Sequence, residues 1–255
     1  MALTLQALSK IPLIHPGDDL GRIIATALTD DALTLMDGDV LVLAQKIVSK
    51  AEGRLVNLNQ VTPSQRALEL AAITQKDARF VELVLSESAE VLRVRVNTLI
   101  VQHRLGFVCA NAGIDHSNVH GDWGADEDWV LLLPEDPDRS AQKLREQMRE
   151  RYGCDVGVMI IDSHGRAWRT GTVGVAIGIA GVPGLVDLRG VPDLFGFQLR
   201  ITQVGAADEL AAAASLVMGQ AAEGTPVVHV RGFPYALRDS KLAELIREKS
   251  LDLFR

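Results

Sequence analysis

Residues 37–54, DGDVLVLAQKIVSKAEGR, carry the clearest structural pattern in the sequence: a turn, a buried strand and a basic segment. Asp37 and Gly38 are typical of a turn, and the apolar run VLVLA at 40–44 predicts a buried strand. Lys46 and Lys50 come next, and on an extended segment they point to the same side. Lysines placed in this way could hold phosphates, although a solvated pair is the commoner explanation of the pattern.

Helix signals lie on both sides of this strand. They predict helices over 20–28, 66–75, 78–88 and 138–152, with N-terminal signals at Asp18 or Asp19, at Thr62-Pro63-Ser64-Gln65, at Asp77 and at Asp136-Pro137. In the second signal, Thr62 is the expected cap of a capping box and Pro63 the first helical residue. Gly153 is well placed to end the last of these helices.

The rest of the chain alternates between strand and helix patterns. Strands are predicted over 91–96, 98–115, 130–134, 154–162 and 226–232. Further helices are predicted over 208–223, closed by Gly224, and over 240–254. The interleaved order predicts an α/β fold, with α+β as the alternative. We expect mixed sheets with flanking helices in a single unit, 1–255, built from two lobes.

Composition excludes several classes of protein. The chain has 255 residues, 47% of them apolar, with 33 acidic and 26 basic residues and a net charge of −7. An acidic protein with 4% aromatic residues lacks the basic face and the stacking surface that nucleic acid needs. No apolar run approaches the ~20 residues of a membrane span, and residues 1–20 do not match a signal peptide. Cys109 and Cys154 lie in apolar runs, which predicts packed thiols in a reduced cytoplasmic protein.

Two predicted strands run into aspartates. Asp115 ends GFVCANAGID and Asp162 ends VGVMIID. Residues just past strand ends are held by a rigid sheet, where binding groups gather. Two carboxylates with the hydroxyl of Ser163 are hard oxygen ligands suited to magnesium or manganese. On spacing alone, Asx-turns or helix caps are the alternative for both aspartates, and the more common one.

Familiar ligand-binding motifs are absent from the sequence. The glycines within 171–184 do not form the dinucleotide fingerprint, and no stretch matches a P-loop. Close backbone packing explains most of these glycines, and a ligand wall is the alternative. His116 and His120 are four residues apart, as in zinc-binding helices, but Gly121 and Gly124 disfavour a helix, and therefore zinc.

Six segments, in the same order along the chain, resemble the coenzyme F-420-0:L-glutamate ligases, also called F-420:γ-glutamyl ligases. They are IPLIHPGDDL (11–20), DGDVLVLAQKIVSKAEGR (37–54), FVCANAGIDHSN (107–118), VMIIDSHGRAWR (158–169), GTVGVAIGIAG (171–181) and ADELAAAASLVMGQAAEGTPVVHVRG (207–232). The resemblance implies a cytoplasmic homodimer with sites near the subunit interface, on a fold unlike P-loop or ATP-grasp ligases. The C-terminal flavin-binding domain of some relatives is not expected here.

The resemblance also implies a reaction. GTP phosphorylates a carboxylate of the deazaflavin precursor F-420-0, and the amine of L-glutamate attacks the acyl phosphate. An amide forms, GDP and phosphate leave, and later glutamates are joined through the γ-carboxylate. Magnesium or manganese is required, and potassium is a further cation that can help.

Site residues follow from the resemblance position by position. The implied metal ligands are Asp115, Asp162, Ser163 and Gln220. The implied catalytic residues are Asp115, Asp162 and Lys50, which would place a charge on the phosphates. The implied nucleotide contacts are Ile11, Pro12, Leu13, Ile14, Gln45, Lys50, Asn118, Met218, Gly219, Gln220, Ala221, Ala222, Glu223, Gly224 and Thr225.

Two other functions use the same residues. A metal-dependent phosphohydrolase or nucleotidyl enzyme would need the same aspartates and lysine. A non-catalytic nucleotide-binding protein is the third reading. Gln45 slightly favours this non-catalytic reading, because many relatives have serine at that position. Glutamine can still donate and accept hydrogen bonds, but the nucleotide contact and the base preference at this position are less secure.

Overall fold

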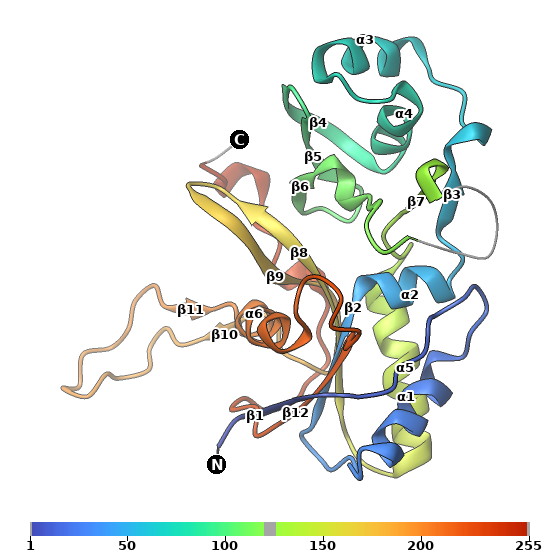
Figure 1. Ribbon diagram of the computed structural model, residues 1–255. Coiled ribbons are helices and arrows are strands. Elements are labelled where there is room, and N and C mark those ends of the chain that lie inside the picture. The colour runs from blue at the N-terminus through green and yellow to red at the C-terminus, as the bar shows by residue number, and fades with distance from the viewer. Residues whose placement is uncertain (1, 120–125, 254–255) are drawn as a thin grey trace.

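A five-stranded mixed sheet forms the centre of the molecule (Figure 1). The computed structural model describes residues 2–119 and 126–253. The sheet order is β1 (Thr4–Ala7), β12 (Val227–Arg231), β2 (Val40–Ala44), β8 (Gly157–Arg166) and β9 (Arg169–Ala180). Strands β2 and β8 are parallel, and the other neighbours are antiparallel. The predicted mixed α/β fold is therefore confirmed.

Helices cover both faces of this sheet (Figure 1). Helices α1 (Leu20–Asp30) and α5 (Pro137–Tyr152) pack on one face, and α6 (Ala206–Met218) packs on the other. Successive side chains of β2 point to opposite faces, so Leu41 and Leu43 join the first core while Val40 and Val42 join the second. The predicted buried strand at 40–44 is confirmed, and its carboxyl end is held rigidly from both sides.

The glycines of β9 let helices approach the sheet closely. A Cβ at Gly174 would lie 2.6 Å from the carbonyl oxygen of Ala211 in α6. A Cβ at Gly178 would lie 2.5 Å from Pro137 at the start of α5. The interpretation of this segment as close backbone packing is confirmed at these two positions.

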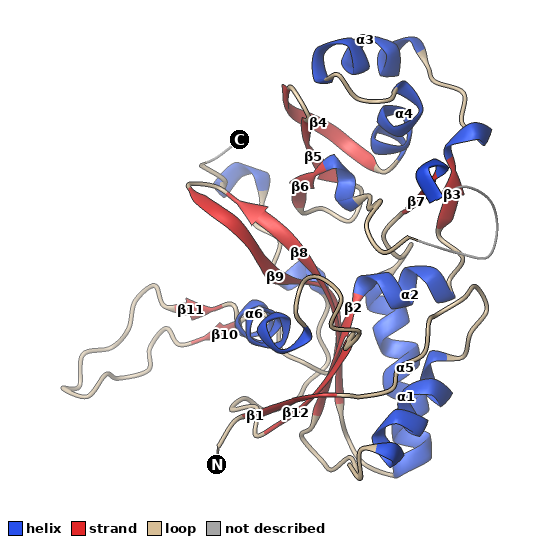
Figure 2. Cartoon of the chain, in the orientation of Figure 1, coloured by secondary structure: helices blue, strands red, loops and turns tan. Residues whose placement is uncertain are grey.

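A second, smaller sheet has a core of its own (Figure 2). It is antiparallel, in the order β4 (Ser88–Arg95), β5 (Thr98–His103), β6 (Val108–Ala110). Helices α3 (Gln65–Thr74) and α4 (Ala78–Ser86) cover it, and Phe80, Leu99 and Val101 are buried between them. A short ladder of β3 (Leu55–Asn57) and β7 (Trp129–Leu131) lies between the two sheets in Figure 1.

The remaining elements are short. They are α2 (Gln45–Ala51), β10 (Val186–Asp187), β11 (Gln203–Val204) and the 3-10 turns Leu58–Gln60, Asn111–Gly113, Asp126–Asp128, Leu242–Glu244 and Lys249–Leu251. Strands β10 and β11 form the base of an arm that extends away from the sheet (Figure 1). No helix in the described ranges is long and apolar enough to cross a bilayer.

Local capping signals were accurate at most helix starts. The side chains of Asp19, Asp77 and Asp136 each accept a hydrogen bond from a backbone N–H in the first turn of their helices. The expected capping box at Thr62 is wrong, because Ser64 caps α3 and Pro63 lies before the cap.

Two helix predictions in the C-terminal part of the chain are also wrong, one for its end and one for the whole helix. Helix α6 ends at Met218, not before Gly224, because Gly219 has a φ of +74° that leaves the helical region. Residues 240–253 form two 3-10 turns instead of a terminal helix. Leu242 N–H donates to the Asp138 carboxylate, and the Glu244 carboxylate accepts from the backbone of Gly184. These tertiary contacts outweigh the local helical pattern.

Candidate active site

The carboxyl end of β2 delivers two polar side chains to Asp115. Gln45 and Lys46 are the first residues of α2, directly after the strand. Gln45 Nε2 donates to Asp115 Oδ2 at 2.8 Å, and Lys46 Nζ lies 3.1 Å from the same oxygen. Ser49 Oγ donates to Gln45 Oε1 at 2.8 Å, which orients the amide. The end of a rigid strand therefore positions a donor pair on one carboxylate.

Asp115 lies in a loop that returns to the same place. It follows the 3-10 turn Asn111–Gly113 and pairs with Leu131 through two backbone hydrogen bonds of 3.0 and 2.9 Å. Burial raises the pKa of the Asp115 carboxyl, and the charge of Asp162 raises it further, while Lys46 opposes the shift. The two predicted aspartates are thus close enough for their charges to interact.

Asp162 does not follow a strand end as predicted. Strand β8 continues to Arg166 because residues 163–165 pair with residues 172–174 of β9 in a long hairpin. The Asp162 carboxylate lies 3.1 Å from His164 Nε2, and both side chains are nearly buried. The His164 ring packs against Phe107, with centroids 5.3 Å apart. Asp162 is therefore held by a strand, not by a loop.

Ser163 and Gln220 form a separate polar pair. Ser163 Oγ donates to Gln220 Oε1 at 2.8 Å, and Gln220 Nε2 donates to Ser215 Oγ of α6 at 2.9 Å. Neighbouring residues of a strand point to opposite sides, so Ser163 faces α6 while Asp162 faces the side of Phe107. The four predicted metal ligands therefore form two pairs on either side of one strand.

The loop after α6 lies beside the loop after Asp115. Asn118 Nδ2 donates to the carbonyl oxygen of Ala221 at 3.3 Å. Within the loop, Ala221 N–H donates to the Glu223 carboxylate, and Thr225 Oγ1 donates to the Met218 carbonyl. The structure thus brings together Asn118 and residues 218–225, which lie far apart in the sequence.

Lys50 lies one helical turn after Lys46, not on the extended segment that was predicted. Both lysines belong to α2, where a spacing of four also places side chains on one face. Burial and the charge of Lys46 lower the pKa of the Lys50 ammonium. The Gly17 N–H donates to the Ala51 carbonyl at 2.8 Å, so the N-terminal segment runs past the end of this helix.

The predicted contact segment 11–14 is only partly accessible. Ile14 is buried in the core and Ile11 packs against that core, whereas the side chain of Leu13 is 81% exposed. Pro12 is also exposed. A ligand at this segment would therefore meet the backbone and the two middle side chains.

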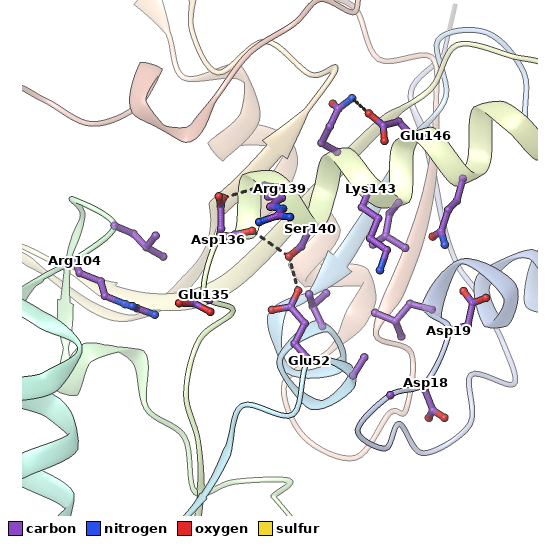
Figure 3. Close-up of a pocket in the computed structure, with 18 residues that line it drawn as sticks. Asp18, Asp19, Glu52, Arg104, Glu135, Asp136, Arg139, Ser140, Lys143 and Glu146 are labelled. Atoms are coloured by element: carbon purple, nitrogen blue, oxygen red, sulfur yellow. Dashed lines mark hydrogen bonds between the residues drawn. The ribbon is translucent and has the colours of Figure 1, made fainter.

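A cavity of about 1240 Å³ lies elsewhere, between α5, the end of α2 and the start of α1 (Figure 3). Its rim carries charges of both signs, including Glu52, Arg139 and Lys143. Ser140 Oγ and the Glu52 carboxylate are hydrogen-bonded across it (Figure 3). None of the predicted site residues lines this cavity, so its size does not mark the site.

The polar groups near Asp115 and Asp162 suit a hard cation better than zinc. Carboxylate, hydroxyl and amide oxygens are the donors that magnesium and manganese prefer. In the described residues, no three His, Cys, Asp or Glu side chains gather as a metal cluster. The zinc pattern involves His120, which lies outside the described residues. Cys109 and Cys154 are free thiols, and burial raises the pKa of Cys109 to about 12.

Two contacts of the aspartates are not evident from the sequence. The sequence pairs Lys46 with Lys50 as possible phosphate ligands, yet Lys46 contacts Asp115 in the structure. His164 contacts Asp162 because a spacing of two in a strand places both side chains on the same side. The D-x-H spacing would have shown this contact, had β8 been predicted to continue.

The mixed α/β fold thus brings acidic, basic and amide side chains together at one end of its central strand, as a candidate active site requires. The profile of the family described as F420-0:Gamma-glutamyl ligase matches residues 9–232. The chain therefore belongs to this family of ligases.

Curated relatives agree over the full length. The chain is 46% identical to the coenzyme F420:L-glutamate ligase of Methanothermobacter thermautotrophicus over 257 residues, covering 100% of both chains. It is 48% identical to the enzyme of that name from Methanopyrus kandleri, covering 97% of both chains. For the Archaeoglobus fulgidus enzyme the identity is 45%, over 96% of this chain and 93% of the relative.

Proposed function

We propose that this chain is a GTP-dependent ligase that joins L-glutamate to F-420-0. The description of the family names F420-0 as the acceptor, and the names of the full-length relatives include L-glutamate. The observation that carries the proposal is the meeting of Asp115, Asp162 and Lys46 at the end of β2. Phosphoryl transfer to a carboxylate needs charge neutralisation at one fixed place.

Magnesium or manganese is the proposed metal, held by the Asp115 and Asp162 carboxylates. Ser163 and Gln220, the other two implied ligands, face the opposite side of β8 and contact each other, so this arrangement does not place them on the same cation. Burial is the main cause of the raised pKa of Asp115 and the charge of Asp162 adds to it, and a nearby cation would favour the ionised form of both carboxylates. When bound, such a cation polarises phosphoryl oxygens and neutralises their charge. Potassium is a further proposed cation, with no residue assigned to it.

The nucleotide would lie along the neighbouring segments. Lys50 would place a positive charge on the phosphates, and its partly buried position strengthens that interaction. Asn118 and the loop 218–225, which already contact each other, would supply amide and backbone groups. The nucleotide would also border the N-terminal segment Ile11, Pro12, Leu13 and Ile14, which leads into the contact of Gly17 with the end of α2. The Gln45 amide donates one hydrogen bond to Asp115, and its second N–H would donate to the nucleotide.

The reaction would proceed in two steps on the acceptor. The acceptor carboxylate takes the terminal phosphoryl group of GTP, and GDP is the leaving group. The amine of L-glutamate then attacks the acyl carbon, the carbon–oxygen bond to phosphate breaks, and an amide forms. A second glutamate joins through the γ-carboxylate of the first. Lys46, which Asp115 and Ser117 hold in place, would put a fixed positive charge beside the developing negative charge.

A homodimer is the proposed assembly. The arm between β10 and β11 carries large apolar side chains that the rest of the chain leaves uncovered: Leu194, Phe195 and Ile201 are 97%, 95% and 87% exposed. Exposed apolar groups on a projecting arm favour burial against another protein surface. Light scattering would report two copies, and L194D together with F195D would shift the mass toward one copy.

Mass spectrometry of the products tests the function directly. Purified protein would be given GTP, manganese, potassium, L-glutamate and F-420-0. We expect product masses that rise by one glutamyl unit at a time, with sustained GDP release only when both acceptor and glutamate are present. Continued GDP formation without glutamate, beyond the one equivalent per site that acyl phosphate formation releases, would favour a phosphohydrolase, and tight GDP binding with no product would favour a non-catalytic protein.

A further inference from the structure

A lysine and a histidine from different segments share one aromatic ring beside the candidate active site. Lys76 lies between α3 and α4, and its Nζ is 5.0 Å from the centroid of the Phe80 ring. His116 stacks on Phe80 with centroids 5.2 Å apart and an angle of 22° between the rings. Phe80 is 5% exposed, so the second core fixes the ring that orients both groups.

Lys76 has no carboxylate partner in the described part of the chain. The neighbouring Asp77 caps α4 and contacts the guanidinium of Arg79 at 2.6 Å. Burial lowers the pKa of the Lys76 ammonium. A partly buried cation with an imidazole near it and no fixed counter-ion is suited to an anionic ligand.

The position of this pair relates it to the reaction. His116 directly follows Asp115, so the pair borders the place where the acceptor carboxylate would react. The loop then diverges: His116 turns onto Phe80, while Asn118 contacts Ala221 on the proposed nucleotide side. Lys76 and His116 thus lie on the Phe80 ring of the second core, while Asn118 of the same loop contacts the loop after α6.

We propose that Lys76 and His116 form a carboxylate-binding subsite for one of the two substrates that the ligase joins, an inference that rests on the proposed function. The ammonium of Lys76 and a ring N–H of His116 would donate to the same carboxylate. The stacked ring of Phe80 limits the motion of both donors and so reduces the entropy lost on binding. L-Glutamate and the acceptor each carry a carboxylate, and the experiment separates them.

Steady-state kinetics of K76Q, K76R and K143Q test the subsite. Lys143 is an exposed lysine of α5 and serves as the matched control. We expect K76Q to raise the KM of either L-glutamate or F-420-0 by about tenfold, the usual effect of one charge-assisted hydrogen bond. The KM of GTP and the thermal midpoint would stay at the wild-type values. K76R would restore most of the affinity, and K143Q would change nothing.

A second readout does not depend on turnover. In protein labelled at histidine, the His116 ring signal, assigned with H116Q, would shift when L-glutamate or F-420-0 is added, and this shift would be lost in K76Q. Unchanged KM values for both carboxylate substrates in an active enzyme would overturn the subsite and leave the proposed ligase intact. A rise in the KM of GTP alone would also overturn it. Absence of any amide product from the wild type would instead refute the ligase proposal.

Discussion

The two ends of strand β2 each hold an aspartate, and the two carboxylates differ in how fully they are satisfied. Asp39 precedes the strand, and Asp115 contacts the two residues that follow it. The Asp39 carboxylate accepts from Arg231 Nε at 2.9 Å and lies 2.9 Å from His229 Nε2. Burial alone would raise its pKa, but these hydrogen bonds outweigh burial and lower the pKa to about 2.

Asp115 shows the opposite balance. Gln45 and Lys46 contact it, yet burial and the charge of Asp162 leave its pKa raised. At the Asp39 end, the chain itself supplies the groups that stabilise the ionised carboxylate. At the Asp115 end, the contacts within the chain stabilise the ionised carboxylate less fully, so a bound cation could stabilise it further. The difference favours a folding role for the Asp39 end, and it agrees with the binding role that the proposed function gives to Asp115.

The largest expected effect is a loss of catalytic activity at the Asp115 end of β2, where the charge of Asp162 acts on Asp115. D162N should lower kcat by about a thousandfold, since losing a charged metal ligand removes several kcal/mol of transition-state stabilisation. D30N, which changes an exposed aspartate at the end of α1, is the control and should keep wild-type turnover. Product formation by D162N at the wild-type rate with limiting manganese would show that Asp162 has no part in catalysis.

The next effect concerns stability at the Asp39 end. D39N should lower the free energy of unfolding by about 3 kcal/mol, because it leaves the buried His229 and the Arg231 guanidinium without their anion. Urea denaturation of the wild type and D39N measures this difference. A loss below about 0.5 kcal/mol would mean that the cluster behaves like a surface ion pair.

Acid should remove a smaller part of the same stabilisation. The pKa of Asp39 is lowered from 3.8 to about 2, so its contribution is present above pH 3.8 and is lost as the pH falls toward 2. The shift corresponds to about 2 kcal/mol. Other carboxylates titrate in the same range, so the quantity to measure is the wild-type stability minus that of D39N from pH 5 to pH 2. A difference that does not change with pH would contradict the role of Asp39.

The smallest expected effect is an increase in the free energy of unfolding, and it concerns Asp115. The folded pKa of Asp115 is raised, so its ionisation destabilises the fold as the pH rises above the unfolded pKa. D115N removes this cost and should raise the free energy of unfolding at pH 7 by up to about 1 kcal/mol in metal-free protein. Denaturation of metal-free D115N and the wild type in parallel gives the comparison. Clear destabilisation would mean that the contacts of Asp115 with Lys46 and Gln45 are structural.

Local signals explain what the sequence predicted well. The caps at Asp19, Asp77 and Asp136 and the helix end at Gly153 depend on a few adjacent residues, and the structure confirms them. The buried strand at 40–44 was equally clear, because an unbroken apolar run needs no partner to be recognised.

Tertiary pairing explains what the sequence missed. Nothing near Asp162 shows that β8 continues, because its extension is fixed by pairing of Ser163 with Gly174 across the hairpin. The segment around Leu242 has a helical pattern but is fixed by Asp138 of a distant helix. The residue pattern alone made Asp115, Asp162 and Ser163 candidates, and the family resemblance added Gln220 and the nucleotide contacts. The contacts of Lys46 and His164 are visible only in the folded chain.

Manganese titration followed by electron paramagnetic resonance, with GDP present, tests the central claim most directly. The wild type and D39N should bind one ion with the same affinity. D115N and D162N should each bind it at least about a hundredfold more weakly, since each loses a charged ligand. Wild-type affinity in both of these variants would contradict the assignment of the two carboxylates to one cation.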